Sequence, residues 1–537
     1  MFALSWAHQP MFATPSDADK KHQPKTLTVA KINLVDFQPH PKRGITQEGV
    51  EALIQSWLDK LGPELTLKQL HGISDEVTIY YREHGLMMAR ASIQAQDITD
   101  KTVNMTIVPG HLGEVVVTGK HFMKPKTIAR PFLPLIDNIV IEEDMKAALK
   151  QVDNLPGLDV FSYFSIGRNP GETRMNLKVL RENPFPWEAS VRTDNYGNKN
   201  TGEQRFIGSF SVDNLTGHAE RYQVGILQTL AEEHVTVGYL NLGFPFFHPK
   251  LDFSWYLSNS QFNLGENFEI LEIQGSGHES QLQFQYRDRL TPTSSRHYSL
   301  HLGLYDNEVT SDVIGDSVNT TLQTHTLGLS GQQAWLLERT RHQLGGQLTF
   351  GQNDNDVLPA SGSNQDDNFT KISLQLQSQW QLDPMGNWYA SLYQHLFWSN
   401  ERLPGTHQTN LSGATINRGF EPGEASVDTG IALHAKLLIP RAKSYFNWLN
   451  QIRPLVFIDY TQGTENAFTS SNATFGSTDY TIASTGLGFL YQQNALSAEL
   501  YLGYGFKHTQ QAEGEDATDI LPNNPKQAYF TVNYVWK

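Results

Sequence analysis

Apolar and polar side chains alternate with a period of two along much of the chain after about residue 186. Three segments show the alternation clearly: 281–290, 371–382 and 496–506. In the segment 371–382, Ile372 and Leu374 fall on one side, while glutamines fall on the other. Successive side chains of a β-strand point to opposite faces of the sheet. The pattern therefore predicts strands with one apolar face and one face of long polar side chains.

Such two-faced strands are typical of a transmembrane β-barrel, with lipid outside and a wet lumen inside. A soluble β-sandwich would alternate too, but the polar face here is rich in glutamine and arginine, and long polar loops are expected at 351–370 and 462–478. The last segment carries Phe530, Tyr534 and Trp536 at alternating positions, and it resembles the C-terminal assembly signal of bacterial outer-membrane proteins. At roughly 22 residues for each strand and turn, we predict an all-β transmembrane barrel of about 16 antiparallel strands over residues 186–537.

The first third of the chain has a different pattern, with helical periodicity. Residues 46–62 place apolar side chains at the spacing of an amphipathic helix, with Thr46 as its cap and Gly62 as its end. A second helix is expected around Leu67–Tyr81, and both helices are accompanied by short strands. We predict two α+β units in tandem, at 28–110 and 111–185. The second contains a helix near 142–152.

Composition excludes several classes of function. The net charge of −15 argues against a nucleic-acid partner, and the absence of cysteine excludes thiolate chemistry. No apolar run reaches the ~18 residues that a membrane helix needs. The sequence has no GxxxxGK[ST] loop, HExxH pair or nucleophile elbow, so we expect no enzyme, no cofactor and no metal site. Acidic clusters such as Asp354–Asp356 are expected to be solvated loops rather than calcium sites.

The two N-terminal units resemble POTRA (polypeptide-transport-associated) domains. The resemblance is carried by the helix with Tyr81, by Gln96-Asp97-Ile98 and Val108-Pro109-Gly110 in the first unit, and by Val117-Thr118-Gly119 and Leu155-Pro156-Gly157-Leu158 in the second. Two POTRA domains before a barrel resemble the transporters of two-partner secretion. The resemblance implies a Gram-negative outer-membrane protein with its POTRA domains in the periplasm. It would export an unfolded exoprotein without ATP.

A pair of short motifs extends this resemblance into the barrel. In the two-partner secretion family, a loop after the eleventh strand carries Val-Arg-Gly-Phe/Tyr, and the thirteenth strand carries Phe-x-Asp-x-Gly. Here Asn417-Arg418-Gly419-Phe420 matches three of four positions of the first, with asparagine in place of valine. The second is matched by Phe457 and Asp459, with Thr461 in place of glycine.

The resemblance implies that residues 404–429 form a loop that folds into the lumen, where Arg418 meets Asp459. A guanidinium and a carboxylate form a bidentate, charge-assisted pair that would latch the loop to the wall. Gly419 is expected to supply backbone freedom at the tip. An unpaired, solvated Arg418 is the alternative interpretation of the same residues.

The implied partners are a large exoprotein with an N-terminal secretion domain (an adhesin, haemolysin or contact-dependent toxin), outer-membrane lipid and the barrel assembly machinery. The transporter itself is expected to be a monomer. Residues 1–27 are expected to hold a linker and a pore-plugging helix. Two other functions stay open: an outer-membrane protein insertase of the same superfamily, which usually has more POTRA domains, and a gated porin.

Overall fold

A computed structural model describes most of the chain. The described residues are 26–98, 100–231, 234–246, 248–265, 272–290, 293–313, 316–356, 368–441, 449–469, 474–523 and 525–537. The predicted plug helix lies outside them. The chain forms two compact units: the first runs up to Gly113 and includes Asp137–Glu142 and Ile166–Thr173, and the second comprises Glu114–Ile136, Glu143–Ser165 and Arg174–Lys537.

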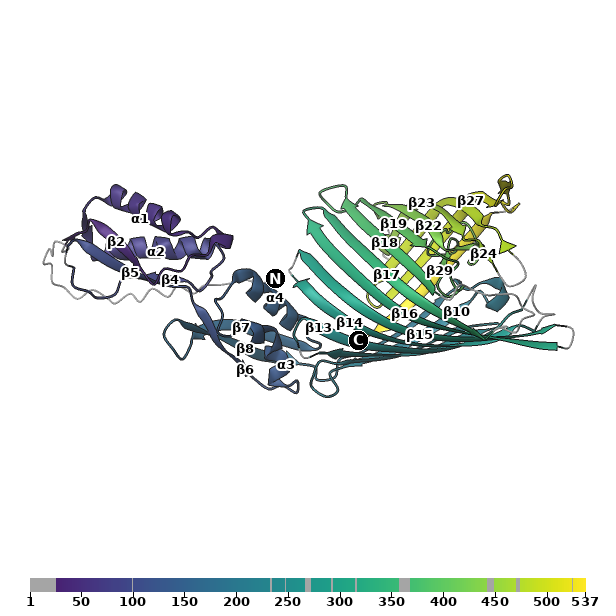
Figure 1. Cartoon of the computed structure of the whole chain (residues 1–537), viewed down its shortest axis with the longest axis horizontal. Helices are drawn as coiled ribbons and strands as arrows, with labels where there is room; N and C mark the ends of the chain where they lie inside the picture. Colours follow the sequence, from purple (N-terminus) through teal and green to yellow (C-terminus); the bar gives the residue numbers. More distant parts are fainter. Residues whose placement is uncertain are drawn as a thin grey trace. The chain divides into compact units, whose positions relative to one another are not determined.

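The described residues of the first unit form two α-helices and two small sheets (Figure 1). Helix α1 (Gln47–Leu61) begins at Thr46, whose hydroxyl accepts a hydrogen bond from the Gly49 N–H at 3.2 Å. Helix α2 (Leu67–Glu83) begins with a capping box between Thr66 and Gln69. The other elements are β1 (Thr26–Thr28), β2 (Lys31–Val35), η1 (Pro41–Arg43), β3 (Glu64–Thr66), β4 (Arg90–Ser92) and β5 (Thr102–Val108). Strands β1 and β3 pair with each other, and the second sheet has the order β2-β5-β4.

The core of this unit combines apolar residues of the strands with the helical stripe that the sequence predicts, and one residue of that stripe is exposed. Leu70, Ile73, Val77 and Tyr81 of α2 are buried. Leu67 is the first residue of the helix, and 61% of it is exposed, so the apolar stripe begins only at Leu70.

A second α+β segment precedes the barrel. Its elements are β6 (His111–Thr118), α3 (Pro125–Ala129), η2 (Arg130–Leu135), α4 (Glu142–Asp153), β7 (Leu158–Ile166) and β8 (Glu172–Glu182). The three strands form a sheet with the order β6-β8-β7, and α4 is the helix expected near 142–152. Gly157 ends the turn before β7 with a positive φ of 67°, a conformation that favours glycine.

A closed antiparallel barrel of 16 strands follows, which confirms the predicted fold class. Its strands are β9 (Trp187–Asp194), β10 (Arg205–Asp213), β11 (Arg221–Thr229), β12 (Val235–Pro245), β13 (Leu251–Asn263), β14 (Gln274–Leu290), β15 (Ser294–Val313), β16 (Asp316–Leu337), β17 (Thr340–Asp356), β18 (Asn368–Gln381), β19 (Tyr389–Ser399), β22 (Thr429–Leu438), β23 (Ile452–Glu465), β26 (Thr478–Gln493), β27 (Leu496–Ala512) and β29 (Lys526–Trp536). Short elements in the connections are η3 (Lys199–Thr201), β20 (Thr409–Asn410), β21 (Ser426–Val427), η5 (Leu449–Gln451), β24 (Phe468–Thr469), β25 (Thr474–Phe475) and β28 (Thr518–Asp519).

The barrel strands are long and two-faced, and some extend into segments predicted to be loops. Asp354–Asp356, expected in a loop, are the last residues of β17, and β23 continues through Glu465. These polar ends are strands because their backbones pair with the neighbouring strands β16 and β26. Outward side chains such as Leu302, Leu329 and Leu374 are between 40% and 50% exposed, as expected for a wall that faces lipid.

The last strand closes the barrel. Strand β29 pairs with β27 on one side and, over Thr531–Trp536, with the first barrel strand β9 on the other. Phe530, Tyr534 and Trp536 point outward, with exposures of 37%, 40% and 43%. Their role as an assembly signal stays a prediction. Among the described helices, none is both long and apolar enough to cross a membrane.

Candidate functional site

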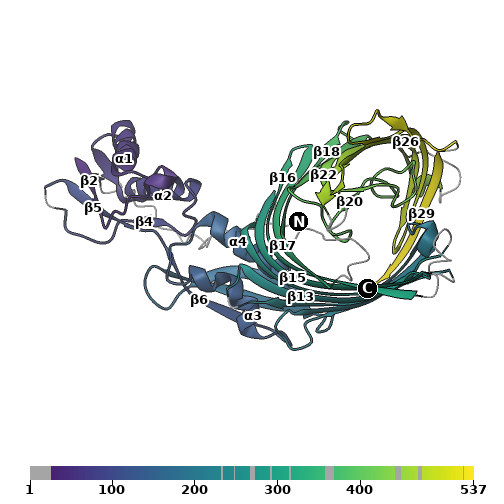
Figure 2. The same ribbon diagram turned by 45° about the vertical axis from the view of Figure 1, so that its right-hand side comes forward.

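The segment between β19 and β22 folds into the barrel. Strand β19 is the eleventh of the barrel and β22 the twelfth, so this loop, residues 400–428, follows the eleventh strand. Strands β20 and β21 pair within it as a small hairpin. Figure 2 shows β20 inside the ring of barrel strands. The predicted loop, 404–429, differs from the observed one by a few residues at its start and one at its end.

Arg418 and Asp459 are in direct contact. The Arg418 Nη2 lies 2.5 Å from Asp459 Oδ1, its Nε donates to Oδ2 at 2.9 Å, and its backbone N–H donates to the same Oδ2 at 3.1 Å. Asp459 is fully buried on β23, the thirteenth strand, and Arg418 is 2% exposed. A solvated Arg418 therefore does not describe this structure. Such a bidentate, water-excluded pair is the strong form of an ion pair.

Aromatic rings and a histidine complete the surroundings of this pair. The Arg418 guanidinium carbon lies 3.8 Å from the ring centre of Phe457 and 4.9 Å from that of Tyr501. Both distances are within the range of cation–π attraction. His434, directly opposite Asp459 in the β22–β23 ladder, places Nδ1 3.2 Å from Asp459 Oδ1. Arg418 is thus held by the Asp459 carboxylate and lies within cation–π distance of two aromatic rings.

Asn417 and Thr461 lie beside the ion pair and contact each other. The Asn417 side-chain amide donates to Thr461 Oγ1 at 3.2 Å and to the Ile482 carbonyl of β26 at 2.9 Å. Thr461 in turn donates to the carbonyl of Leu411 in the loop at 3.0 Å. Both side chains are fully buried. The two positions that depart from the family pattern are therefore neighbours in space.

Gly419 is needed for space and not for backbone freedom, which corrects the expectation from sequence. Its φ lies outside the left-handed range, but a Cβ there would come within 2.5 Å of the Ser484 Cβ and 2.6 Å of the Gly505 nitrogen. Strand β27 also has no room for a side chain where it faces the tip of the loop (residues 417–420), because a Cβ on Gly503 would lie 2.0 Å from the Arg418 carbonyl oxygen. The tip thus rests directly on the backbone of β27.

Phe420 anchors the far side of the tip. Its ring is 1% exposed in an apolar cluster with Phe397, Leu411 and Ile482. Its carbonyl accepts a hydrogen bond from the Tyr529 hydroxyl at 2.5 Å. The loop therefore touches β23, β26, β27 and β29, the strands that follow β22 around the barrel.

The base of the loop, which we call the stem (residues 402–408 and Asp428), is held together by a second buried carboxylate. Asp428 accepts hydrogen bonds from the Leu403 N–H at 3.0 Å, the Gln408 amide at 3.1 Å and the Asn466 N–H at 2.7 Å. Arg402 pairs closely with Glu465 and lies 4.0 Å from Asp428.

A lysine and a histidine also hold the stem. Lys371 donates to the His407 carbonyl at 2.6 Å. Burial, and then the Lys371 ammonium, lower the pKa of His407 to about 4. The His407 ring is therefore neutral at physiological pH, and it packs against Tyr305 and Phe369.

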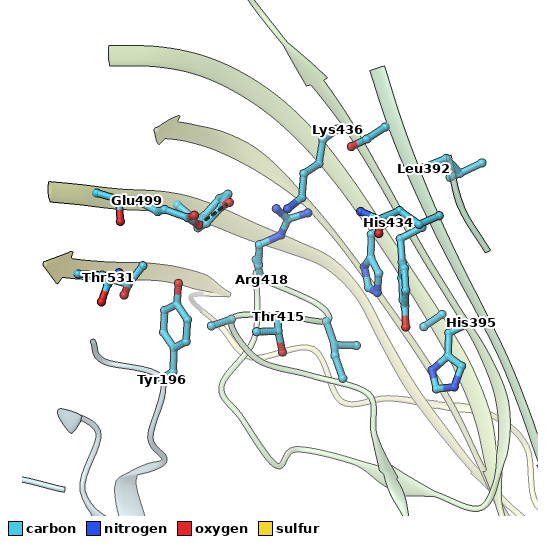
Figure 3. A pocket seen from close by; sticks show the side chains of 18 of the residues that line it. Tyr196, Leu392, His395, Thr415, Arg418, His434, Lys436, Glu499 and Thr531 are labelled. Atoms are coloured by element: carbon cyan, nitrogen blue, oxygen red, sulfur yellow. Dashed lines mark hydrogen bonds between the residues drawn. The ribbon is translucent and has the colours of Figure 1, made fainter. Parts of the chain in front are cut away.

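A cavity of about 850 Å³ lies beside the tip. In Figure 3 its wall brings Arg418 of the loop together with Lys436, His434 and Glu499 of the strands. The cavity shows that the loop does not fill the lumen at this level. No group of three or more acidic, histidine or cysteine side chains suited to a metal occurs in the described part of the chain.

Sequence reasoning missed several residues that build the site. His434, Tyr501 and Tyr529 were not identified. The glycines Gly503 and Gly505 alternate with lipid-facing residues on β27, and this pattern was the available signal, since a strand glycine often marks close approach of another backbone.

Comparison with known families gives the same picture. The sequence model of the "Haemolysin secretion/activation protein ShlB/FhaC/HecB" family matches residues 171–491, and that of the ShlB-type POTRA domain matches residues 40–110. The first match covers more than half of the chain. The chain belongs to the ShlB/FhaC/HecB family.

Individual relatives in this family are distant. The heme/hemopexin transporter protein HuxB of Haemophilus influenzae is 22% identical over 69% of this chain. That alignment spans 66% of HuxB, just under two thirds of its length. The hemolysin transporter protein HpmB of Proteus mirabilis is 20% identical over 90% of this chain and 85% of its own length.

Solved structures share the fold. CdiB from Escherichia coli superposes with a TM-score of 0.67 at 18% identity, covering 98% of this chain and 94% of CdiB. BamA from Haemophilus ducreyi, lacking its first three POTRA domains, gives a TM-score of 0.53 at 13% identity. Family and fold together make this ShlB/FhaC/HecB protein an outer-membrane protein whose POTRA domains belong in the periplasm.

Proposed function

We propose that this protein exports a large exoprotein across the outer membrane through its barrel. The client is captured unfolded in the periplasm by the POTRA domains, which add a client strand to an exposed sheet edge or hold it in a groove. One observation carries the proposal: a loop inside the lumen is held to the wall by the buried Arg418–Asp459 pair. Membership of a family whose named relatives are transporters supports it.

The proposed client is a large protein with an N-terminal secretion domain. CdiB is named an outer membrane transporter, HpmB a hemolysin transporter protein and HuxB a heme/hemopexin transporter protein. An adhesin, haemolysin or toxin encoded beside this gene would be a client of this class. The protein acts as a monomer, after insertion by the barrel assembly machinery.

The Arg418–Asp459 pair is proposed to be a latch that keeps the loop at one position in the lumen. Its state is measurable apart from export because the sequence contains no cysteine. The substitution A414C places one thiol next to Phe457 and Tyr501, at a position that is 8% exposed. Slow maleimide labelling of A414C then reports a docked tip, and fast labelling reports a released one.

Co-expression with the neighbouring exoprotein tests the export function. We expect the wild type to release that one client into the medium, while deletion of the gene leaves other outer-membrane proteins at normal levels. Loss of many barrel proteins on deletion would instead indicate an insertase. A steady pore without dependence on any client would indicate a porin.

Export is proposed to need no ATP and no catalytic step by this chain. Folding of the client outside the cell would make its return unfavourable and so give the direction. Purified protein in liposomes, given unfolded client and no nucleotide, is expected to move the client into a protease-protected interior. A strict requirement for added ATP would contradict this part of the proposal.

A further inference from the structure

The latch has a second, uncharged contact next to the ion pair. The Asn417 amide donates two hydrogen bonds to the barrel wall, one to Thr461 Oγ1 and one to the Ile482 carbonyl. The Thr461 hydroxyl donates its single hydrogen to the Leu411 carbonyl. The Thr461 hydroxyl therefore joins two segments of the loop to β23, and the Asn417 amide adds a hydrogen bond to β26.

Burial makes these two side chains depend on each other. Asn417 and Thr461 are both fully buried, and a buried polar group without a partner costs more than its hydrogen bond contributes. The Asn417 Oδ1 has no partner among the described atoms, so this amide is placed for its donors. Removal of the Thr461 hydroxyl alone would leave a buried N–H and a buried carbonyl unsatisfied.

The two contacts run in register along the same strand. Arg418 meets Asp459, and the residue before it meets Thr461, two positions further along β23 on the same lumen-facing side. A single ion pair fixes one point of the loop. A second contact beside it also fixes the direction in which the loop crosses the strand.

We propose that Asn417 and Thr461 are a matched pair of positioning residues that set the register of the loop on β23. The pair holds the guanidinium in line with the Asp459 carboxylate. This inference rests on the proposed latch. It also explains why the chain departs from the family pattern at both positions: the asparagine requires an acceptor, and the threonine supplies it.

The test uses A414C labelling in the full-length protein, with single variants N417V and T461V and the double variant. Threonine and valine have the same shape, so T461V removes only the hydroxyl. We expect each single variant to label roughly tenfold faster, and the double variant to be clearly slower than the product of the two effects. T461S should recover most of the slow labelling lost in T461V, because it keeps the hydroxyl.

The matched control is T531V, which makes the same chemical change where the hydroxyl has no partner. It should label like the parent. N417V changes no barrel strand, so it keeps the test informative if T461V fails to assemble, as judged by heat-dependent gel mobility. Unchanged labelling in N417V, or strictly multiplicative effects in the double variant, would overturn the matched pair.

Client export is measured in the same strains. Faster labelling with normal export would leave the matched pair intact and refute the latch as part of the export function. Unchanged labelling with normal export in N417V, while R418A is defective in both, would refute the matched pair alone.

Discussion

Asp459 and Asp428 are both fully buried carboxylates, and both hold the loop between β19 and β22, but with different donors. Asp459 binds the charged side chain of Arg418 at the tip. Asp428 accepts hydrogen bonds from two backbone N–H groups and an uncharged amide at the stem, and the Arg402 guanidinium lies farther away, at 4.0 Å. The donors at the stem lie close to strand ends that the barrel already fixes. The tip lies on strands that do not carry the ends of the loop, and the Arg418–Asp459 pair holds it there together with uncharged contacts, so we expect the tip to be the weaker position once the charged pair is removed.

The largest expected effect comes from breaking the charged pair. Arg418→Ala or Asp459→Ala leaves the other charge buried without its partner, which typically costs about 3–5 kcal/mol. We expect fast A414C labelling and loss of most secreted client, with the barrel still assembled by heat-dependent gel mobility. Arg418→Lys keeps the charge but not the planar, bidentate guanidinium, so its labelling rate and its export should lie between those of the wild type and those of Arg418→Ala. Full secretion by either alanine variant would refute the latch.

A substitution of the β27 glycine under the tip should release the tip without touching either charge. In Gly503→Ala the new methyl group would lie 2.0 Å from the Arg418 carbonyl, so the tip must lift. Overpacking of this kind costs about 1–3 kcal/mol. We expect faster A414C labelling and reduced export. Gly345→Ala is the matched control, since nothing lies within 4 Å of a Cβ on that β17 residue.

Weakening the stem should have a smaller effect on the tip. Asp428→Asn replaces a charged acceptor and turns one donor toward the backbone N–H groups, at about 1–2 kcal/mol. We expect A414C labelling to rise less than in Arg418→Ala, and export to be partly retained. Equal labelling in the two variants would show that stem and tip form a single cooperative unit, and the contrast between them would be lost.

The smallest effect is expected at the outer ion pair between Lys199 and Glu421. Its nitrogen and oxygen lie 2.5 Å apart, but the lysine side chain is 55% exposed. Exposed pairs are worth about 0–1 kcal/mol. Lys199→Ala should therefore secrete and label like the wild type, both at low and at high salt. A strong loss of export would place the latch at this pair instead of at Asp459.

The barrel was readable from the sequence because a two-faced strand repeats a simple period. The lipid-facing Leu302, Leu329 and Leu374 follow that period. The contact between Arg418 and Asp459 was anticipated through the motif pair. His434 could not be found in that way, because its place beside Asp459 depends on the ladder register between β22 and β23.

Other features of the site depend on tertiary contacts that no local pattern encodes. Tyr501 and Tyr529 reach the loop from β27 and β29, strands that lie far from it in the sequence. Gly419 was identified correctly as a residue of the tip, but the reason is close packing against β27 and not a left-handed turn. The asparagine and threonine departures looked independent in the sequence, and only the folded chain makes them neighbours.

The stem has a consequence for repeated use of the pore. If the tip leaves Asp459 while Asp428 keeps the two ends of the loop together, the guanidinium stays tethered near its carboxylate. Its return is then an intramolecular reaction, with an effective concentration on the order of millimolar for a short flexible tether. Such a tether would return the loop to its docked position after each passage without any added energy source.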